Sequence, residues 1–151
     1  MIWSKKYVRA QRKPPMPQAL PVYAAIARAL HDQRVETLFG LMGDANLFMV
    51  DHFVRELKGR YVPSVHEAGA VLMALGHASV TGDVGVVTIT HGPAVSNAVT
   101  ALIEGAKGTL PIVLLCGDTP VADPDHPQAV AQRALIEATG AGFEQLKSPA
   151  T

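Results

Sequence analysis

The sequence has little of what marks disulfide-bonded, membrane-spanning or nucleic-acid-binding proteins. Cys116 is the one cysteine, so no internal disulfide can form, which is typical of a reducing compartment such as the cytoplasm. No apolar stretch reaches the roughly 20 residues that a helix needs to span a membrane. The 13 Lys and Arg residues balance the 13 Asp and Glu residues, so charge gives no reason to expect binding to nucleic acid or to a membrane surface. We therefore expect a cytoplasmic protein with neither kind of partner.

Motifs for metal and nucleotide binding are also missing. None of the six histidines is paired with Cys, Asp or Glu at a recognisable zinc spacing, so we expect no metal site within this chain. No Gly-x-Gly-x-x-Gly sequence follows an expected strand, which argues against a Rossmann-type nucleotide binder. The pairs Gly82-Asp83 and Gly117-Asp118 stand alone and are weak candidates for a nucleotide loop.

The composition fits one folded domain. With 151 residues, of which 48% are hydrophobic, the chain can bury a sizeable core but has no room for a second full domain. Residues 1–17 are basic and rich in proline, and we expect a flexible, solvated tail there. The folded domain is expected at 18–147, with a short end at 148–151.

Apolar segments alternate between the patterns of helices and strands. Helices are expected at 20–32, 46–57, 67–79, 95–107 and 128–139, and strands at 37–39, 60–65, 85–90 and 110–116. The strands are continuous apolar runs separated by helices, which is typical of a parallel sheet covered on both faces. The predicted fold class is therefore α/β, with a doubly wound parallel sheet flanked by helices on both faces.

Glu67 is the leading candidate for a functional residue. It follows an extended apolar segment and opens a helix, which places its carboxylate at the carboxyl edge of the expected sheet, where ligands bind in open α/β folds. The Gly/Pro-rich elbow THGPAVSN, at 90–97, follows another strand and would reach the same edge. An acid in the first turn of a helix is also common for dipole reasons, so its position by itself leaves both interpretations open.

Three segments together resemble a known family. They are FGLMGDANLFMVDHF at 39–53, the stretch from HEAGAV to CGDTP at 66–120, and Gln132. In this order they are similar to the N-terminal pyrimidine-binding domain of thiamine diphosphate enzymes, within the group of acetolactate synthase, pyruvate oxidase and benzoylformate decarboxylase. The resemblance covers almost the whole chain and implies the thiamine diphosphate-binding fold.

The resemblance implies a catalytic role for Glu67. In the family, the glutamate at this strand end hydrogen-bonds a ring nitrogen of the cofactor's aminopyrimidine and favours its imino tautomer, which takes a proton from the thiazolium carbon. Surroundings of low polarity suit a carboxyl group with this task. The apolar neighbours of Glu67 in sequence are Val65, Ala68, Ala70 and Val71. We expect the adjacent His66 to have a structural or peripheral role.

The family's Gly-x-Pro-Gly-Gly loop corresponds to residues 40–46. The resemblance implies that Met42 and Gly43 line the cofactor, because glycine lets the backbone approach closely. Met42 stands where the family has proline, and Asp44 stands where it has the second glycine. Asp44 is also a residue type that caps helices, and we expect it to be the N-cap of the next helix.

The family's Thr-Ser-Gly-Pro-Gly-x-x-Asn elbow corresponds to residues 90–97. The matching positions, which the resemblance assigns to cofactor binding, are Thr90, Gly92, Pro93 and Asn97. His91 replaces the serine; its imidazole could act as a substrate-side acid or base near neutral pH, or it could cap or pack at the helix entrance. Gln132 matches a glutamine whose amide lies near the reactive end of the cofactor, although Ala131 replaces the phenylalanine before it.

The resemblance also implies partners. Family enzymes hold the cofactor's diphosphate through Mg²⁺ in a second domain, whose Gly-Asp-Gly…Asn-Asn type of signature has no match in this sequence. We therefore expect a fragment of a longer enzyme or one subunit of a split enzyme, inactive alone, that meets a diphosphate-binding domain in cis or in a partner subunit. A homo-oligomer and a small 2-oxo acid substrate are expected as well. The alternative is a degenerate or truncated copy that serves as an interaction module.

Overall fold

The centre of the protein is a four-stranded parallel sheet with the strand order β2-β1-β3-β4. The structure is a computed structural model that describes residues 19–120, 122–123 and 125–146. The strands are β1 (Thr37–Gly40), β2 (Arg60–Pro63), β3 (Gly85–Ile89) and β4 (Ile112–Cys116). The helices are α1 (Val22–Asp32), α2 (Leu47–Arg55), α3 (Glu67–Thr81), α4 (Pro93–Lys107) and α5 (Gln132–Ala138).

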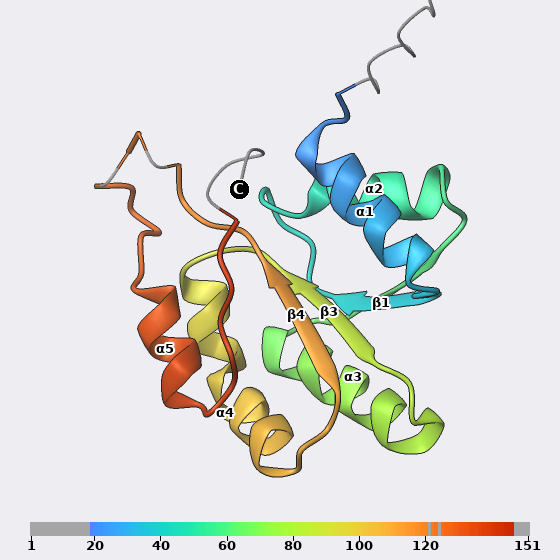
Figure 1. The fold of residues 1–151 in the computed structure, drawn as a ribbon. Helices are drawn as coiled ribbons and strands as arrows, with labels where there is room; N and C mark the ends of the chain where they lie inside the picture. Colours follow the sequence, from blue (N-terminus) through green and yellow to red (C-terminus); the bar gives the residue numbers. More distant parts are fainter. Residues whose placement is uncertain (1–18, 121, 124, 147–151) are drawn as a thin grey trace, which may run out of the picture.

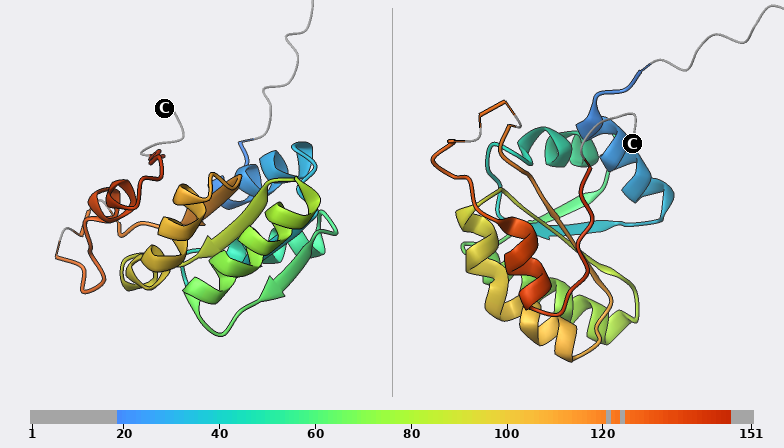
Figure 2. Two further views of the ribbon diagram at one scale, coloured as in Figure 1. Left: turned by 90° about the horizontal axis from the view of Figure 1, so that it is seen from below. Right: turned by 60° about the vertical axis from the view of Figure 1, so that its left-hand side comes forward.

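Helices cover both faces of this sheet. Figure 1 shows α1 and α2 on one face and α3 and α4 on the other, with α5 beside α4. The two further views in Figure 2 show the same layers. The arrangement confirms the predicted α/β class with a doubly wound parallel sheet.

Alternating side chains along the strands build two cores. Leu38 of β1 and Val86 of β3 are buried together with Phe53 of α2. Their chain neighbours Phe39 and Val87 belong to the opposite core, beneath α3 and α4. Because successive residues of a strand point to opposite faces, a strand that is covered on both sides needs apolar residues at every position. That requirement explains the continuous apolar runs in the sequence.

Two element boundaries that differ from the prediction matter for the site. β2 ends at Pro63 rather than at residue 65, because the Ser64 hydroxyl donates to the carbonyl of His66 (2.8 Å) and turns the chain. α5 begins at Gln132 rather than at residue 128, because Gln128 is engaged by the loop that follows β3. Both differences leave loop residues at the edge where the strands end.

The predicted tail at 1–17 and the predicted end at 148–151 lie outside the described residues. The predicted domain at 18–147 contains all nine elements of the described part of the chain. None of the helices in that part is long and apolar enough to cross a membrane.

The strand order creates a position where a ligand can bind. β1 has β2 on one side and β3 on the other, so the direction of winding reverses next to β1. In open α/β sheets, ligands bind outside the carboxyl ends of the strands at such a reversal. The loops that follow β1, β2 and β3 therefore form the candidate site.

Candidate functional site

Glu67 opens α3 after the loop that follows β2. His66 is the N-cap of this helix, because its Nδ1 accepts the backbone N–H of Ala68 (3.2 Å). The Glu67 side chain is half-buried rather than enclosed. Val65, expected to be an apolar neighbour, is 99% exposed, because the chain has already turned out of β2. The expected apolar surroundings are therefore not formed on that side by the described residues.

Asn97 holds the carboxylate of Glu67. The Asn97 amide Nδ2 donates to Oε2 of Glu67 at 3.0 Å, and Asn97 lies in the first turns of α4. No described residue donates a hydrogen bond to the other oxygen, Oε1 of Glu67. The pair thus fixes one carboxylate oxygen and leaves the second free to meet a ligand.

Asn46 organises the loop between β1 and α2, a role that the sequence did not reveal. Its side chain is 4% exposed. Its Oδ1 accepts the backbone N–H of Gly43 (2.8 Å), and its Nδ2 donates to the carbonyl of Leu41 (3.1 Å) and to the hydroxyl of Thr88 (3.2 Å). Asn46 is also the residue that precedes α2, so the predicted N-cap at Asp44 is wrong. The one available signal was an asparagine directly before an apolar helix.

Gly43 lies against the elbow that follows β3. A Cβ atom added to Gly43 would be 3.0 Å from the Cβ of Thr90, which is tighter than most such contacts, so glycine favours this close approach. Met42, the residue before it, is 43% exposed. The loops after β1 and after β3, both predicted to line a ligand, therefore meet.

Gly92 makes the turn from β3 into α4. Its φ of 61° lies in the left-handed region that favours glycine, and a Cβ atom there would collide with the carbonyl oxygen of Gln128. Pro93 follows as the first residue of the helix, where its missing N–H leaves no hydrogen bond unmade. The Gly-Pro pair in the sequence thus encodes this elbow.

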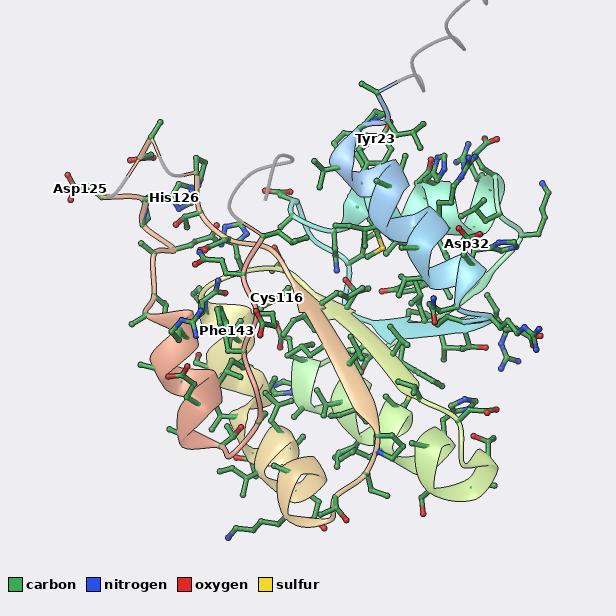
Figure 3. All side chains as sticks on the ribbon, in the orientation of Figure 1. Tyr23, Asp32, Cys116, Asp125, His126 and Phe143 are labelled. Carbon is green, nitrogen blue, oxygen red and sulfur yellow. The ribbon has the colours of Figure 1, made fainter. Side chains whose placement is uncertain are left out.

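His91 is buried in the same elbow, with 8% of its surface exposed. Its Nε2 lies 2.9 Å from Oε1 of Gln128, and its Nδ1 lies 3.3 Å from Oγ1 of Thr90. The ring of His126 stands edge-on to it, with 5.7 Å between ring centroids. In Figure 3, His126 and Asp125 lie on the loop beyond the carboxyl end of β4, and Asp125 points away from the body. Both nitrogens of His91 are therefore engaged by neighbouring residues.

Gln132 begins α5 and is 5% exposed. Its Oε1 accepts the backbone N–H of Gly92 at 2.9 Å. Its Nε2 donates to the carbonyl of Gly117 at 3.0 Å and to Oδ1 of Asp118 at 3.1 Å. The amide thus joins the loop after β4 to the elbow after β3, and Asp118 is a second residue that the sequence did not single out for the site.

The predicted site residues therefore differ in what they contact. Glu67 contacts Asn97 directly, and Gly43 lies against Thr90. Gln132 contacts Gly92 but also the loop after β4, and the buried His91 lies against Gln128 of the segment after β4. Met42 and Pro93 are exposed.

Cys116 ends β4, close to this cluster of loops (Figure 3). Burial raises the pKa of its thiol, the negative charge of Asp118 raises that pKa further, and a backbone hydrogen bond acts in the opposite direction. The thiol is thus kept protonated at neutral pH, which disfavours its reaction as a nucleophile. Among the residues that the structure describes, no group of three or more His, Cys, Asp or Glu side chains is placed to hold a metal ion.

Acetolactate synthases are similar to this chain in sequence. The enzyme of Mycobacterium leprae is 38% identical over 101 residues, which are 67% of this chain and 16% of that protein. The mitochondrial catalytic subunit of Saccharomyces cerevisiae is 37% identical over 113 residues, which are 75% of this chain and 16% of that protein. The chain thus spans 16% of the length of each of these synthases.

A solved structure shares the fold. The thiamine diphosphate-dependent 4-hydroxybenzoylformate decarboxylase of Rhodococcus jostii superposes with a TM-score of 0.68 at 23% sequence identity, covering 76% of this chain and 22% of that one. Residues 21–139 match the family model described as the thiamine pyrophosphate enzyme, N-terminal TPP binding domain. This chain therefore belongs to the family of N-terminal thiamine pyrophosphate-binding domains of thiamine pyrophosphate enzymes.

Proposed function

We propose that this chain binds the aminopyrimidine ring of thiamine diphosphate, as one module of an acetolactate synthase-like enzyme that makes or breaks carbon–carbon bonds next to a 2-oxo group. The observation that carries the proposal is the contact between Glu67 and Asn97 at the carboxyl edge of the sheet (3.0 Å). Membership of the family and the similarity to acetolactate synthases support it.

The residues at this edge fit such a ring. Asn97 occupies Oε2 of Glu67 and leaves Oε1 available to a ring nitrogen. Glu67 is half-buried, so a ligand at the edge can reach its carboxylate. Gly43 lies against Thr90 without a side chain of its own, which lets a flat ring approach the backbone closely.

Each residue has a task that follows from its place. When bound, thiamine diphosphate supplies a thiazolium carbon that can be deprotonated and then add to a 2-oxo acid. Glu67 holds or releases a proton at the ring nitrogen, as a positioned carboxyl group does in general acid–base catalysis. Asn97 keeps the carboxylate in one orientation, and Thr90, Gly92 and Pro93 shape the wall beside the ring.

Other domains complete the proposed site. A diphosphate-binding domain, in the same chain or in a partner subunit, would hold the diphosphate through Mg²⁺, and this chain by itself would not turn over 2-oxo acids. Exposed apolar side chains lie near the amino ends of α1 and α2, beside the carboxyl edge of the sheet. They support an interface with another domain or subunit at this surface. They are Tyr23, Met42, Leu47 and Phe48, of which Phe48 is 65% exposed. Assembly into a homo-oligomer belongs to the same proposal.

The second candidate function is that of an inactive, degenerate domain serving as an interaction module. The internal contacts of His91 and Gln132 favour it, because they leave fewer polar groups for a ligand. The presence of Met42 and Asp44 in the first loop favours it as well.

Ligand binding to the whole chain distinguishes the two functions. The nitrogen-15-labelled chain would be titrated with thiamine diphosphate, with the aminopyrimidine fragment of thiamine, and with pyrophosphate alone. We expect the first two ligands to shift the backbone amides of Gly43 and Thr90 and the side-chain amide of Asn97, and pyrophosphate to leave them in place. Glu67→Gln should weaken these shifts. If millimolar aminopyrimidine moved none of the three resonances, the interaction module would be the better description.

A further inference from the structure

The Gln132 side chain joins two loops, the elbow after β3 and the loop after β4. We propose that it is a positioning residue, which fixes the elbow between β3 and α4 through Gly92 and does not itself contact the cofactor. This role deepens the proposed function and rests on it, because the elbow matters for catalysis only if the ring binds beside it.

The hydrogen-bonding capacity of the Gln132 amide is already used. A glutamine side chain has one carbonyl oxygen and two N–H donors. The oxygen accepts from Gly92 (2.9 Å), and the nitrogen donates to the Gly117 carbonyl (3.0 Å) and to Asp118 Oδ1 (3.1 Å). The side chain is 5% exposed. A ligand would have to replace a buried hydrogen bond to reach the amide nitrogen, which is unfavourable unless the freed groups find new partners.

The segment around Gln132 lies against the elbow at further points. The carbonyl of Gln128 occupies the space that a Cβ atom of Gly92 would need. Oε1 of Gln128 lies 2.9 Å from Nε2 of His91. Residues 128–132 therefore contact both His91 and Gly92, where the chain turns into α4. Within this segment, Gln132 accepts the hydrogen bond from the Gly92 N–H.

The loop after β4 is packed just as closely on its other side. A Cβ atom on Gly117 would collide with the side chain of Ala45, in the loop after β1. Gln132 binds the carbonyl of that same Gly117. The loops after β1, β3 and β4 thus form one packed unit, with the Gln132 amide between the last two.

The elbow connects Gln132 to the proposed reaction site. Gly92 immediately precedes α4, whose Asn97 donates to Glu67. The direction in which the chain enters α4 sets where the Asn97 amide lies. Loss of the Gln132 amide should therefore be detected at Asn97, although no hydrogen bond joins these two residues.

The test measures hydrogen exchange and amide resonances of the whole chain by NMR, without cofactor. In Gln132→Ala we expect exchange of the Gly92 amide to speed up by about 5-fold or more, as for loss of one hydrogen bond, and the Asn97 side-chain amide to shift. Gln145→Ala is the matched control. Gln145 also donates to Asp118 (3.0 Å) but is exposed and lies outside the elbow, so its loss should leave Gly92 and Asn97 unchanged.

A conservative variant keeps the inference testable if Gln132→Ala does not fold. Gln132→Glu retains the acceptor for Gly92 but loses both donors, so Gly92 should stay protected while exchange rises in the loop at Gly117 and Asp118. Unprotected Gly92 in this variant would overturn the inference. So would an unchanged Gly92 in a folded Gln132→Ala chain.

Added cofactor gives a separate outcome. If thiamine diphosphate shifted the side-chain amide resonances of Gln132 in the parent chain, the amide would have left Gly117 and Asp118 to bind the cofactor directly. The inference would then be wrong. If thiamine diphosphate did not bind at all, the proposed function would fail, and the cofactor-free exchange of Gly92 would still decide the role of Gln132.

Discussion

The Asn97 amide and the Glu67 carboxylate meet at 3.0 Å across the starts of two helices. α3, which carries Glu67, follows β2, and α4, which carries Asn97, follows β3. These strands are not neighbours, because β1 lies between them in the sheet. The pair therefore bridges the carboxyl end of β1, where the direction of winding reverses and where a ligand is expected.

The first prediction concerns Glu67 in an enzyme that contains the diphosphate-binding domain. Glu67→Gln preserves size and the hydrogen bond from Asn97 but removes the ionisable proton. Exchange of the proton on the thiazolium carbon, followed by NMR, should slow by about 10²- to 10⁴-fold, as for loss of a positioned acid or base. The thermal unfolding midpoint should change little.

A matched control is Glu104→Gln, which removes an exposed carboxylate from the other end of α4. It should leave the exchange rate unchanged. If Glu67→Gln exchanged as fast as the parent enzyme, Glu67 would be no more than an acid at the start of a helix.

Asn46 should matter more for stability than Asn97. Asn46→Ala removes a buried side chain that makes hydrogen bonds to Gly43, Leu41 and Thr88, and each is worth about 1 kcal/mol. We expect the free energy of unfolding in urea to fall by about 2–3 kcal/mol. Asn97→Ala loses one bond at an exposed position and should cost about 1 kcal/mol or less. Equal losses of unfolding free energy in the two variants would contradict the role of Asn46 in holding the loop between β1 and α2.

Tyr61→Phe should stabilise the protein. The hydroxyl oxygen of Tyr61 is buried and has no hydrogen-bond partner among the described residues, and burial raises the pKa of this phenol. Removing an unsatisfied buried hydroxyl is expected to raise the free energy of unfolding by about 1 kcal/mol. Tyr23→Phe, at an exposed position, serves as the control in the same urea titration. A loss of stability in Tyr61→Phe would mean that the hydroxyl has a bound partner.

The reactivity of Cys116 should follow its raised pKa. Burial and the charge of Asp118 favour the neutral thiol, so alkylation of the folded chain by iodoacetamide should begin at higher pH than for an ordinary thiol. Asp118→Asn keeps an oxygen acceptor at the same place but removes the charge, which lowers the pKa of Cys116 and moves the profile toward lower pH. An unmoved profile would show that burial alone sets this pKa.

The same shift links stability to pH. The thiol of the unfolded chain ionises at lower pH than the thiol of the folded chain, so unfolding releases a proton between the two pKa values. The contribution of Cys116 to stability is therefore present below the ordinary thiol pKa and declines as pH rises above it. In thermal melts, the unfolding midpoint of Cys116→Ser should therefore fall less steeply than that of the parent chain as pH rises above the ordinary thiol pKa.

Local patterns were sufficient to predict the class of fold. β3 is buried on both faces of the sheet and therefore needs apolar residues at consecutive positions, which the sequence shows as a continuous apolar run. Glycine and proline likewise predicted the elbow at Gly92 and Pro93, because the backbone conformation at such residues depends on the residues themselves and their near neighbours in sequence. Position at the start of a helix similarly marked Glu67.

The partners of these residues were decided by tertiary structure. Asn97 is 30 residues from Glu67, and Gln132 is 40 residues from Gly92, so neither contact exists until the parallel strands align and bring their carboxyl ends together. The side chain of Asn46 reaches Thr88 across 42 residues for the same reason. The sequence by itself determined which elements form and which polar groups reach the edge, since periodicity and turn chemistry are local. Only the packed sheet decided which of those groups bind one another and which face outward, because hydrogen bonds between distant loops depend on the register of the strands that carry them.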